Sequence, residues 1–201
     1  MLTIVFAETA LEFFKGKALD ANDDWKELAR YDNKDKRGRP DIAHDLLKLS
    51  LDSELNKRGL LRVFVHTFDD RVITVSPKLR LPRAYGRFLG LVEDLNKKNK
   101  IAFQSDVLLK IEARDLKTLL HPLQGKKIVL EAKGGHKTLK EFSEMMAGDI
   151  VLIIGGFPHG DFLDKSNALD GLQRVALGSE ELTAPAVLAK ALTCAELANG
   201  F

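Results

Sequence analysis

A glycine-rich stretch follows an apolar run in the second half of the chain. Ile150–Ile154 has the composition of a buried strand, and Gly155, Gly156 and Gly160 follow it in the segment GGFPHGDF. Ligands of open α/β sheets bind outside the carboxyl ends of the strands, so this break is well placed for a ligand. Its spacing matches neither GxxxxGK nor GxGxxG, which disfavours a nucleoside triphosphate.

Two further predicted strands are flanked by small residues in the same way. Lys133-Gly134-Gly135-His136 follows the predicted strand Lys127–Ala132, and Ala176-Leu177-Gly178-Ser179 stands before Glu180–Thr183. Glycine allows close approach to the backbone, so the three exits could form one binding site. The alternative is that these glycines merely end their strands.

Arginines recur along one side of a predicted helix, Pro82–Lys98. At 100° per residue, Arg83 and Arg87 lie opposite the apolar face, and Arg80 extends their row. A row of forked guanidinium donors suits a phosphate backbone. A solvated helix face explains the same spacing equally well.

Another arginine, Arg39, stands two residues before a carboxylate, Asp41. An arginine held by a carboxylate is a prepositioned hydrogen-bond donor. Asp41 is also expected to cap the predicted helix Asp41–Leu51, so an ordinary capped loop remains the alternative.

The histidines and the cysteine indicate neither a metal site nor a covalent nucleophile. The histidines lack HxxxH and HExxH spacing, and a single cysteine permits no disulfide and no CxxC pair. Cys194 is expected to pack within an apolar helix, Thr183–Ala198. His44 and His159 are expected to support the Arg39 loop and the glycine-rich loop. We therefore expect no metal.

Composition indicates one globular domain. The 201 residues are 45% hydrophobic and 30% charged. No apolar run reaches the roughly 18 residues that span a bilayer, and the first residues lack a signal-peptide pattern, so a cytoplasmic location is expected. The net charge is +2, yet residues 141–201 hold three basic and nine acidic residues, which leaves +8 on residues 1–140. This asymmetry is a weak indication of nucleic-acid binding.

Alternating elements predict an α/β fold with a mostly parallel sheet in the second half. The predicted strands are Leu2–Phe6, Leu60–His66 and Val72–Val75 (a hairpin), Ile101–Gln104, Lys127–Ala132, Ile150–Ile154 and Arg174–Leu177. The predicted helices are a short one around Trp25, Asp41–Leu51, Pro82–Lys98, Ala113–Leu120, Thr138–Ala147 and Thr183–Ala198.

Four segments, in order and at compatible spacing, resemble a known family. They are RGRPDIAHDLL (37–47), LLRVFVHT with its hairpin (60–75), RLPRAYGRFLGLVEDL (80–95) and GGFPHGDF (155–162). The family is that of the ribosome-biogenesis methyltransferases that modify N1 of a pseudouridine in small-subunit ribosomal RNA. They belong to the SPOUT superfamily. Residues 16–36 and 99–126 show no such resemblance, and 176–187 fit in general character only.

The resemblance implies a single domain over residues 1–201, with an α/β fold and a C-terminal trefoil knot. The RNA-recognition elements, including an inserted β-hairpin and helical extension, are expected within 37–98, and the knotted part, which binds S-adenosylmethionine, within 127–201. The implied cofactor residues are Gly155, Gly156, Gly160, Ala176, Leu177, Gly178 and Leu182. The implied RNA contacts are Arg39, Arg80, Arg83 and Arg87.

The resemblance also implies a reaction and partners. The N1 of pseudouridine can lose its proton and attack the sulfonium methyl in one in-line displacement. Arg39 is expected to contact the target nucleotide and stabilise the ring anion, and Asp41 to steady Arg39. Asp41 is a candidate base only if this pairing leaves it able to accept a proton. A homodimer is expected, with ribosomal assembly proteins as candidate partners.

Two alternative functions remain open at this point. One is an RNA-binding ribosome assembly factor with weak or dispensable methyl transfer. The other is a SPOUT enzyme that acts on transfer RNA, against which the RPDIxH and RLPRxY segments argue, because they belong to the recognition part.

Overall fold

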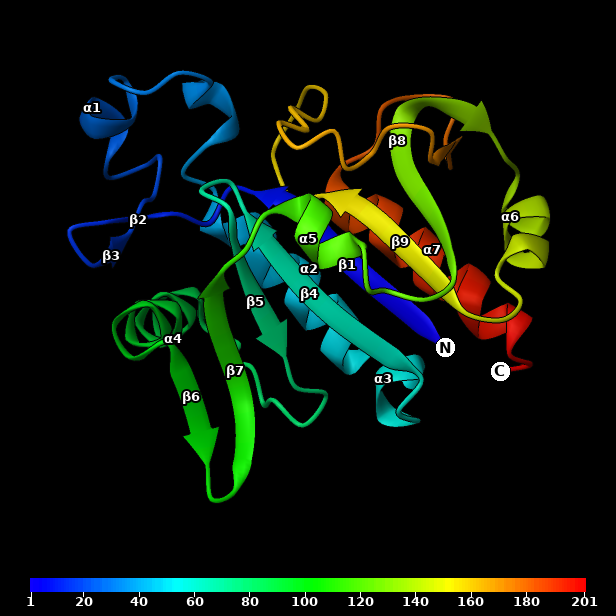
Figure 1. The fold of residues 1–201 in the computed structure, drawn as a ribbon, viewed down its shortest axis with the longest axis horizontal. Helices are drawn as coiled ribbons and strands as arrows, with labels where there is room; N and C mark the ends of the chain where they lie inside the picture. Colours follow the sequence, from blue (N-terminus) through cyan, green and yellow to red (C-terminus); the bar gives the residue numbers. More distant parts are fainter.

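An eight-stranded sheet runs through the centre of the protein, in the order β10-β8-β9-β1-β4-β5-β7-β6 (Figure 1). This computed structural model describes every residue from Met1 to Phe201. The central strand β1 (Leu2–Thr9) pairs in parallel with β4 (Leu61–Thr67) on one side and with β9 (Ile150–Gly155) on the other. All eight residues of β1 are buried, as expected of a strand covered on both faces.

The sheet has a parallel half and an antiparallel half. On the parallel side, β8 (Lys126–His136) pairs with β9 and with the edge strand β10 (Gln173–Ala176). On the other side, β5 (Arg71–Val75) turns back from β4, and β7 (Asp106–Ala113) and β6 (Lys100–Phe103) follow it in antiparallel pairs. The β6–β7 hairpin extends away from the body of the protein (Figure 1).

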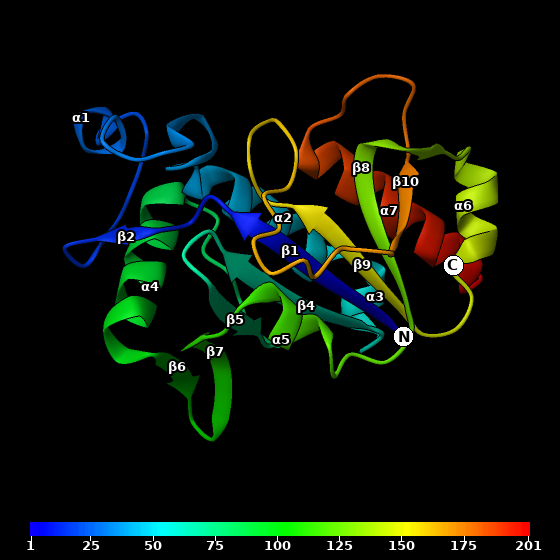
Figure 2. The ribbon, with the colours of Figure 1, turned by 45° about the horizontal axis from the view of Figure 1, so that its top comes forward.

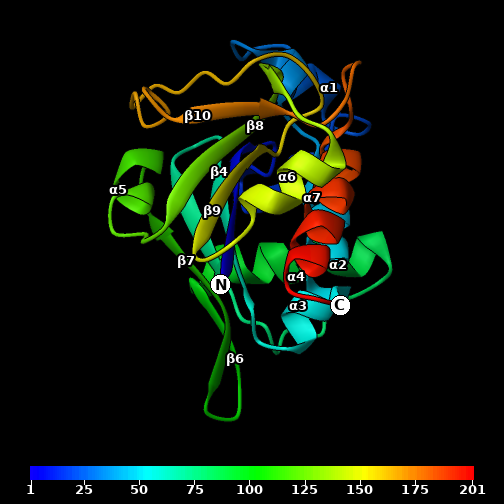
Figure 3. The same cartoon turned by 90° about the vertical axis from the view of Figure 1, so that its right-hand side faces the viewer.

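Two apolar clusters fill the faces of the sheet. Within β1, Ile4 and Phe6 belong to the larger cluster and Val5 and Ala7 to the smaller one, which is the alternation of a strand. The larger cluster includes side chains from α2 (Pro40–Asp52), α4 (Tyr85–Lys98), α6 (Leu139–Met145) and α7 (Ala184–Ala198). The opposite face is covered by the short α5 (Leu116–Leu120) and by the β9–β10 connection (Figure 3).

The remaining short elements lie at the margins of these layers. Residues 10–39 contain α1 (Trp25–Leu28), η1 (Lys34–Lys36) and the two-stranded β2 (Phe13–Phe14) and β3 (Lys17–Ala18). They lie beside the carboxyl end of β1 (Figure 1). α3 (Glu54–Lys57) follows α2 directly. No helix has both the length and the apolarity needed to cross a membrane.

The end of the chain takes a return path. After β9 it runs back past β8, pairs with the far side of β8 as β10, and then forms α7 against α2 and α6. The amide of Lys137 donates to the carbonyl of Ala176, which ties the exits of β8 and β10 together (2.9 Å).

The predicted α/β fold with a mostly parallel second half is confirmed, and several predicted boundaries are wrong. The stretch Lys133–His136 belongs to β8, which continues past Ala132 with its glycines inside the strand. Residues 106–113 form β7, so the predicted helix Ala113–Leu120 shrinks to α5. α4 begins at Tyr85 and leaves Pro82 and Arg83 outside the helix, because Ala84 has an extended backbone.

Gly134 explains how β8 and β10 approach so closely. A Cβ added there would lie 2.5 Å from the backbone nitrogen of Val175, whereas a Cβ on Gly135 would meet nothing nearer than 3.9 Å. Backbone atoms held in a sheet cannot move aside cheaply, so we predict that Gly134→Ala lowers the free energy of unfolding by about 2 kcal/mol. The matched Gly135→Ala is expected to stay within about 0.5 kcal/mol of wild type. Urea unfolding of both variants measures the difference, and equal stabilities would contradict the prediction.

Candidate functional site

A hollow of about 370 Å³ lies at the carboxyl ends of the parallel strands. Its walls come from the end of β8, the loop after β9 and the loop after β10, and Figure 2 shows the last two loops beside each other above the sheet. The sequence-predicted cofactor residues that line it are Gly155, Gly160, Ala176, Leu177, Gly178 and Leu182. The three strand exits therefore do converge on one site.

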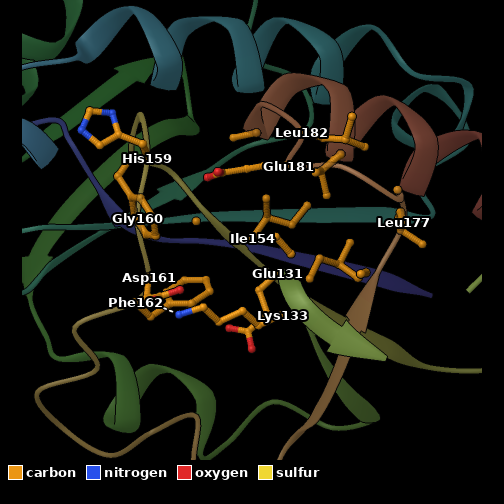
Figure 4. A pocket seen from close by; sticks show the side chains of 18 of the residues that line it. Glu131, Lys133, Ile154, His159, Gly160, Asp161, Phe162, Leu177, Glu181 and Leu182 are labelled. Carbon is orange, nitrogen blue, oxygen red and sulfur yellow. Dashed lines mark hydrogen bonds and ion pairs between the residues drawn. The ribbon is translucent and has the colours of Figure 1, made fainter. Parts of the chain in front are cut away.

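The lining of this hollow suits a cation that carries apolar groups. Four carboxylates line it, from Glu131, Asp161, Glu180 and Glu181, against a single lysine, Lys133. Figure 4 shows Glu131, Lys133 and Asp161 on one side of the hollow and Glu181 across from them. Apolar side chains such as Ile154 and Leu182 supply much of the remaining wall. The donor set therefore fits the sulfonium of S-adenosylmethionine and lacks the basic groups that a phosphorylated cofactor needs.

Lys133 and Asp161 join two walls of the hollow through an ion pair of 2.5 Å. The hydrogen bond between the two side chains lowers the pKa of the Asp161 carboxyl and raises the pKa of the Lys133 ammonium. Both groups are solvent-exposed, so the pair contributes little to stability. Its effect is to hold the end of β8 near the loop after β9.

Gly156 is the predicted cofactor residue that does not line the hollow. It is buried, and its missing Cβ would fall on the side chain of Thr9 at the end of β1. Its amide donates to the carbonyl of Ala7 (2.9 Å). Gly156 therefore fits the loop onto β1, whereas a Cβ on Gly178 would press on Leu182 inside the site.

Arg39 and Asp41 form a forked ion pair. Nε of Arg39 donates to Oδ1 of Asp41 (2.8 Å), and Nη2 donates to Oδ2 (2.7 Å). The Nη1 group of Arg39 makes no hydrogen bond within the chain and stays available to a substrate. The hydrogen bonding of Arg39 to the Asp41 carboxylate also raises the pKa of Arg39. The pairing of Arg39 with Asp41 that the sequence suggested is therefore present, and the role of Arg39 as a prepositioned donor stays a prediction.

Asp41 differs from its prediction in one respect. It was expected to cap α2, but α2 begins at Pro40 with Arg39 in the cap position and no side-chain cap. Partial burial alone would raise the pKa of the Asp41 carboxyl, but the hydrogen bonds and charge of Arg39 outweigh it and leave that pKa below its usual value. A carboxylate that is paired at both oxygens and easily ionised is a poor proton acceptor.

A single residue, Ala10, connects Arg39 to the glycine-rich loop through its backbone. The amide of Arg39 donates to the carbonyl of Ala10 (2.9 Å), and the amide of Ala10 donates to the carbonyl of Gly156 (3.0 Å). Two residues later, the buried carboxylate of Glu12 accepts hydrogen bonds from Arg37. The exit of β1 therefore positions both the Arg39 loop and the cofactor loop. Sequence reasoning missed this segment, because backbone hydrogen bonds leave no residue-type signal.

Glu8, at the end of the same strand, anchors the rest of the β9–β10 connection. Its buried carboxylate accepts hydrogen bonds from the amides of Leu163 (2.7 Å) and Asp164. The residue adopts a left-handed backbone (φ 50°), which is uncommon for a side chain other than glycine, asparagine or aspartate. Its amide donates to Nδ1 of His66 (3.2 Å), so His66 carries its proton on Nε2 and faces Asp70. Burial keeps the pKa of His66 below its usual value.

The three arginines of the RLPRAYGRF segment are all exposed. Arg83 pairs with Asp52 at the end of α2, whereas Arg80 and Arg87 have no acidic partner in the chain. Because α4 begins at Tyr85, the three side chains do not form the helical stripe that the sequence predicted. Arg80 and Arg83 instead line a separate surface hollow of about 740 Å³. Its other basic residues are Lys48, Lys57 and Lys78.

The histidines and the cysteine have structural positions. His44 is buried, stacks on Phe88 at 4.5 Å between ring centroids, and hydrogen-bonds through Nε2 to the carbonyl of Pro82 (2.7 Å). It therefore supports the 80–84 segment and not, as expected, the Arg39 loop. His159 is an exposed residue on the rim of the hollow. Cys194 is buried within α7, as predicted. No group of three His, Cys, Asp or Glu side chains is arranged to hold a metal ion.

We predict that Glu8→Gln loosens the β9–β10 connection. An uncharged amide has one acceptor oxygen, so it cannot replace the two charge-assisted hydrogen bonds to Leu163 and Asp164. The expected loss of stability is about 2 kcal/mol. Amide hydrogen exchange at Leu163 and Asp164 is expected to accelerate more than exchange in β4. Glu144→Gln, an exposed change on α6, is the matched control, and unchanged exchange in Glu8→Gln would contradict the anchor.

Comparison with known proteins places the chain in a family. Residues 4–196 match the family described as EMG1/NEP1 methyltransferase. A Pyrobaculum aerophilum protein named ribosomal RNA small subunit methyltransferase Nep1 is 40% identical over 83% of this chain and 75% of its own length. The protein of the same name from Thermococcus kodakarensis is 38% identical over 87% of this chain and 78% of its own length.

A solved structure is also similar over nearly the whole chain. It is that of Archaeoglobus fulgidus Nep1 bound to S-adenosylhomocysteine, with a TM-score of 0.89, 30% sequence identity, and 99% of each chain covered. The likeness in fold and the match in sequence therefore extend over the strand exits and the arginine segments described above. This chain belongs to the EMG1/NEP1 methyltransferase family.

Proposed function

We propose that this protein transfers a methyl group from S-adenosylmethionine to N1 of a pseudouridine in small-subunit ribosomal RNA. The reaction class follows from membership of a methyltransferase family whose relatives are named for small-subunit ribosomal RNA. A neighbour in fold is a complex with S-adenosylhomocysteine, the product that the donor leaves after transfer. The names of the relatives do not specify the target atom or the roles of individual residues, so both are part of the proposal.

The hollow at the strand ends is the proposed methyl-donor site. When bound there, S-adenosylmethionine supplies an electrophilic methyl group. Gly155, Gly160 and Gly178 line the hollow, and the carboxylates of Glu131 and Glu181 favour a positive ligand. Ala176, Leu177 and Leu182 supply apolar contacts. Gly156 acts indirectly, through its fit against Thr9.

Arg39 is the proposed catalytic contact to the target nucleotide. Asp41 fixes its guanidinium, and the free Nη1 group can donate to a pyrimidine carbonyl. Such a donor stabilises the negative charge that the ring acquires when N1 loses its proton. Pseudouridine leaves N1 free, whereas N1 of uridine is bonded to ribose, so only the former can accept the methyl group there. The role of Asp41 is to orient Arg39, since its lowered pKa makes it a poor base.

The basic surface around residues 80–87 is the proposed RNA-binding face. Arg80 and Arg87 have no acidic partners, and Arg80 and Arg83 line a hollow with five basic side chains and one acidic side chain, Asp52. Such a charge balance suits a phosphate backbone. These groups belong to residues 37–98, the proposed recognition part, whereas the proposed donor site draws on residues 127–201.

A homodimer is part of the same proposal. Leu139 on α6 and Leu197 on α7 are large apolar side chains that stay exposed, at 42% and 62%. The two helices lie side by side on one face of the sheet (Figure 3). Their exposed apolar groups support an interface there, and ribosomal assembly proteins remain proposed partners of the assembled enzyme.

We predict methyl transfer to a hairpin RNA that carries pseudouridine and none to the matched hairpin with uridine. Arg39→Ala is expected to lower kcat by about 100-fold, because one donor to the developing ring anion is lost. Its affinity for S-adenosylhomocysteine is expected to stay near wild type, since the backbone bond to Ala10 remains. Labelled methyl transfer and calorimetry are the measurements. Binding of both hairpins without transfer to either would instead favour an assembly factor.

We also predict that Arg80→Gln and Arg87→Gln weaken RNA binding and flatten its salt dependence. Each phosphate contact contributes about 0.9 to the slope of log affinity against log salt, so each variant should lose about one unit. The value of kcat at saturating RNA is expected to be unchanged. Lys117→Gln, an exposed change on α5, is the control. An unaltered slope in both arginine variants would place the RNA elsewhere.

A further inference from the structure

Lys36 has the most unusual environment of the basic residues near the site. It ends η1, three residues before Arg39, and is only 9% exposed. Its ammonium is buried and makes no hydrogen bond. A buried charge without a partner is costly, so it calls for a reason other than stability.

The side chain of Lys36 packs into the glycine-rich loop. Its Nζ lies 4.0 Å from the centre of the Phe157 ring. Its Cε occupies the space beside Gly160, where an added Cβ would come within 3.2 Å. Phe157 and Gly160 both line the proposed donor site, whereas Lys36 does not. Lys36 therefore supports two residues of the site wall from outside the hollow.

The charges around Lys36 do not neutralise it directly. Glu8 and Asp161 are near enough to favour the ammonium, but Glu8 is bonded to the amides of Leu163 and Asp164, and Asp161 to Lys133. On its own element, Lys34 and Asp35 are exposed. Burial outweighs the two carboxylates, so the pKa of Lys36 lies below its usual value. The ring of Phe157 is then the one close partner of the charge, through a cation–π contact.

We propose that Lys36 is a positioning residue that holds the Gly155–Gly160 loop in its donor-binding shape and in register with Arg39. The inference rests on the proposed function, since it assigns the loop to the methyl donor. Lys36 and Arg39 lie on one short segment of the chain. This segment therefore contacts the glycine-rich loop twice, through the packing of Lys36 on Phe157 and through the hydrogen bonds of Ala10 to Arg39 and Gly156. In-line transfer depends on sub-ångström alignment of donor and target. Lys36 therefore sets the distance between the two halves of the site.

The decisive variant is Lys36→Met, which keeps the apolar stem and removes the charge. We expect its affinity for S-adenosylhomocysteine to fall about tenfold, or about 1.4 kcal/mol, and kcat to fall further while the RNA affinity is unchanged. Its melting temperature is expected to rise, because the folded state no longer buries a lone charge. Lys36→Arg is expected to recover most of the affinity, since a guanidinium also binds an aromatic face. Lys34→Met, an exposed change on the same element, is the control.

The pH dependence gives a second readout. The folded chain binds the Lys36 proton less tightly than the unfolded chain, so wild-type stability is expected to rise as pH increases through the lowered pKa. Affinity for S-adenosylhomocysteine is expected to fall over the same range, because the neutral amine no longer binds the Phe157 ring. Lys36→Met is expected to show neither change. In a cycle with Phe157→Leu, the double variant should bind about as well as either single variant.

The possible failures are distinguishable. If wild type binds no S-adenosylhomocysteine, the proposed function itself is wrong. If wild type binds and Lys36→Met binds within twofold, the positioning role is refuted and the proposed function stands. If Lys36→Met lowers both the melting temperature and the affinity, and Lys36→Arg restores neither, then Lys36 only fills space and the inference is overturned.

Discussion

The arrangement of the site depends on one backbone connection, the residue Ala10. Its carbonyl accepts from Arg39 and its amide donates to the carbonyl of Gly156, so one residue links the Arg39 loop to the glycine-rich loop. Glu8 and Glu12, on either side, hold Leu163, Asp164 and Arg37 through buried carboxylates. Because these anchors continue a fully buried central strand, the rigidity of the sheet reaches both halves of the site.

The two hollows differ in charge. The hollow at the strand ends carries an excess of carboxylates, and the surface near Arg80 and Arg83 carries an excess of amines and guanidinium groups. The basic residues lie mainly in residues 1–140 and the acidic excess lies in residues 141–201, although the overall charge of the chain is only +2. The buried charges at Glu8 and Glu12 anchor the segments around the end of β1. Burying a charged side chain is costly unless it is paired, and both carboxylates are paired with hydrogen-bond donors of the segments that they hold in place.

The sequence made the fold class, the convergence of three strand exits and the Arg39–Asp41 pair predictable. Apolar runs and glycine spacing report burial and turns, and a resemblance spread over four segments added the donor. The ends of elements were less predictable. The glycines of β8 were predicted to form a loop after the strand, because the neighbouring sequence does not indicate that Gly134 packs against Val175. Pro82 was predicted in the first turn of a helix, whereas α4 begins at Tyr85 and the Pro82 carbonyl is hydrogen-bonded to His44. The burial of Lys36 could not be predicted, because it depends on Phe157, more than 100 residues away in the sequence.

The central place of β1 has a consequence for how the protein is made. One neighbour of this strand, β4, follows within 70 residues, whereas the other, β9, begins at Ile150. At the speed of translation, on the order of ten seconds pass with that edge of β1 unpaired. Folding that relies on such distant pairings is slow, and exposed strand edges invite association with other chains. The proposed donor site, whose walls extend to Val187, is therefore complete only when almost all of the chain has been synthesised.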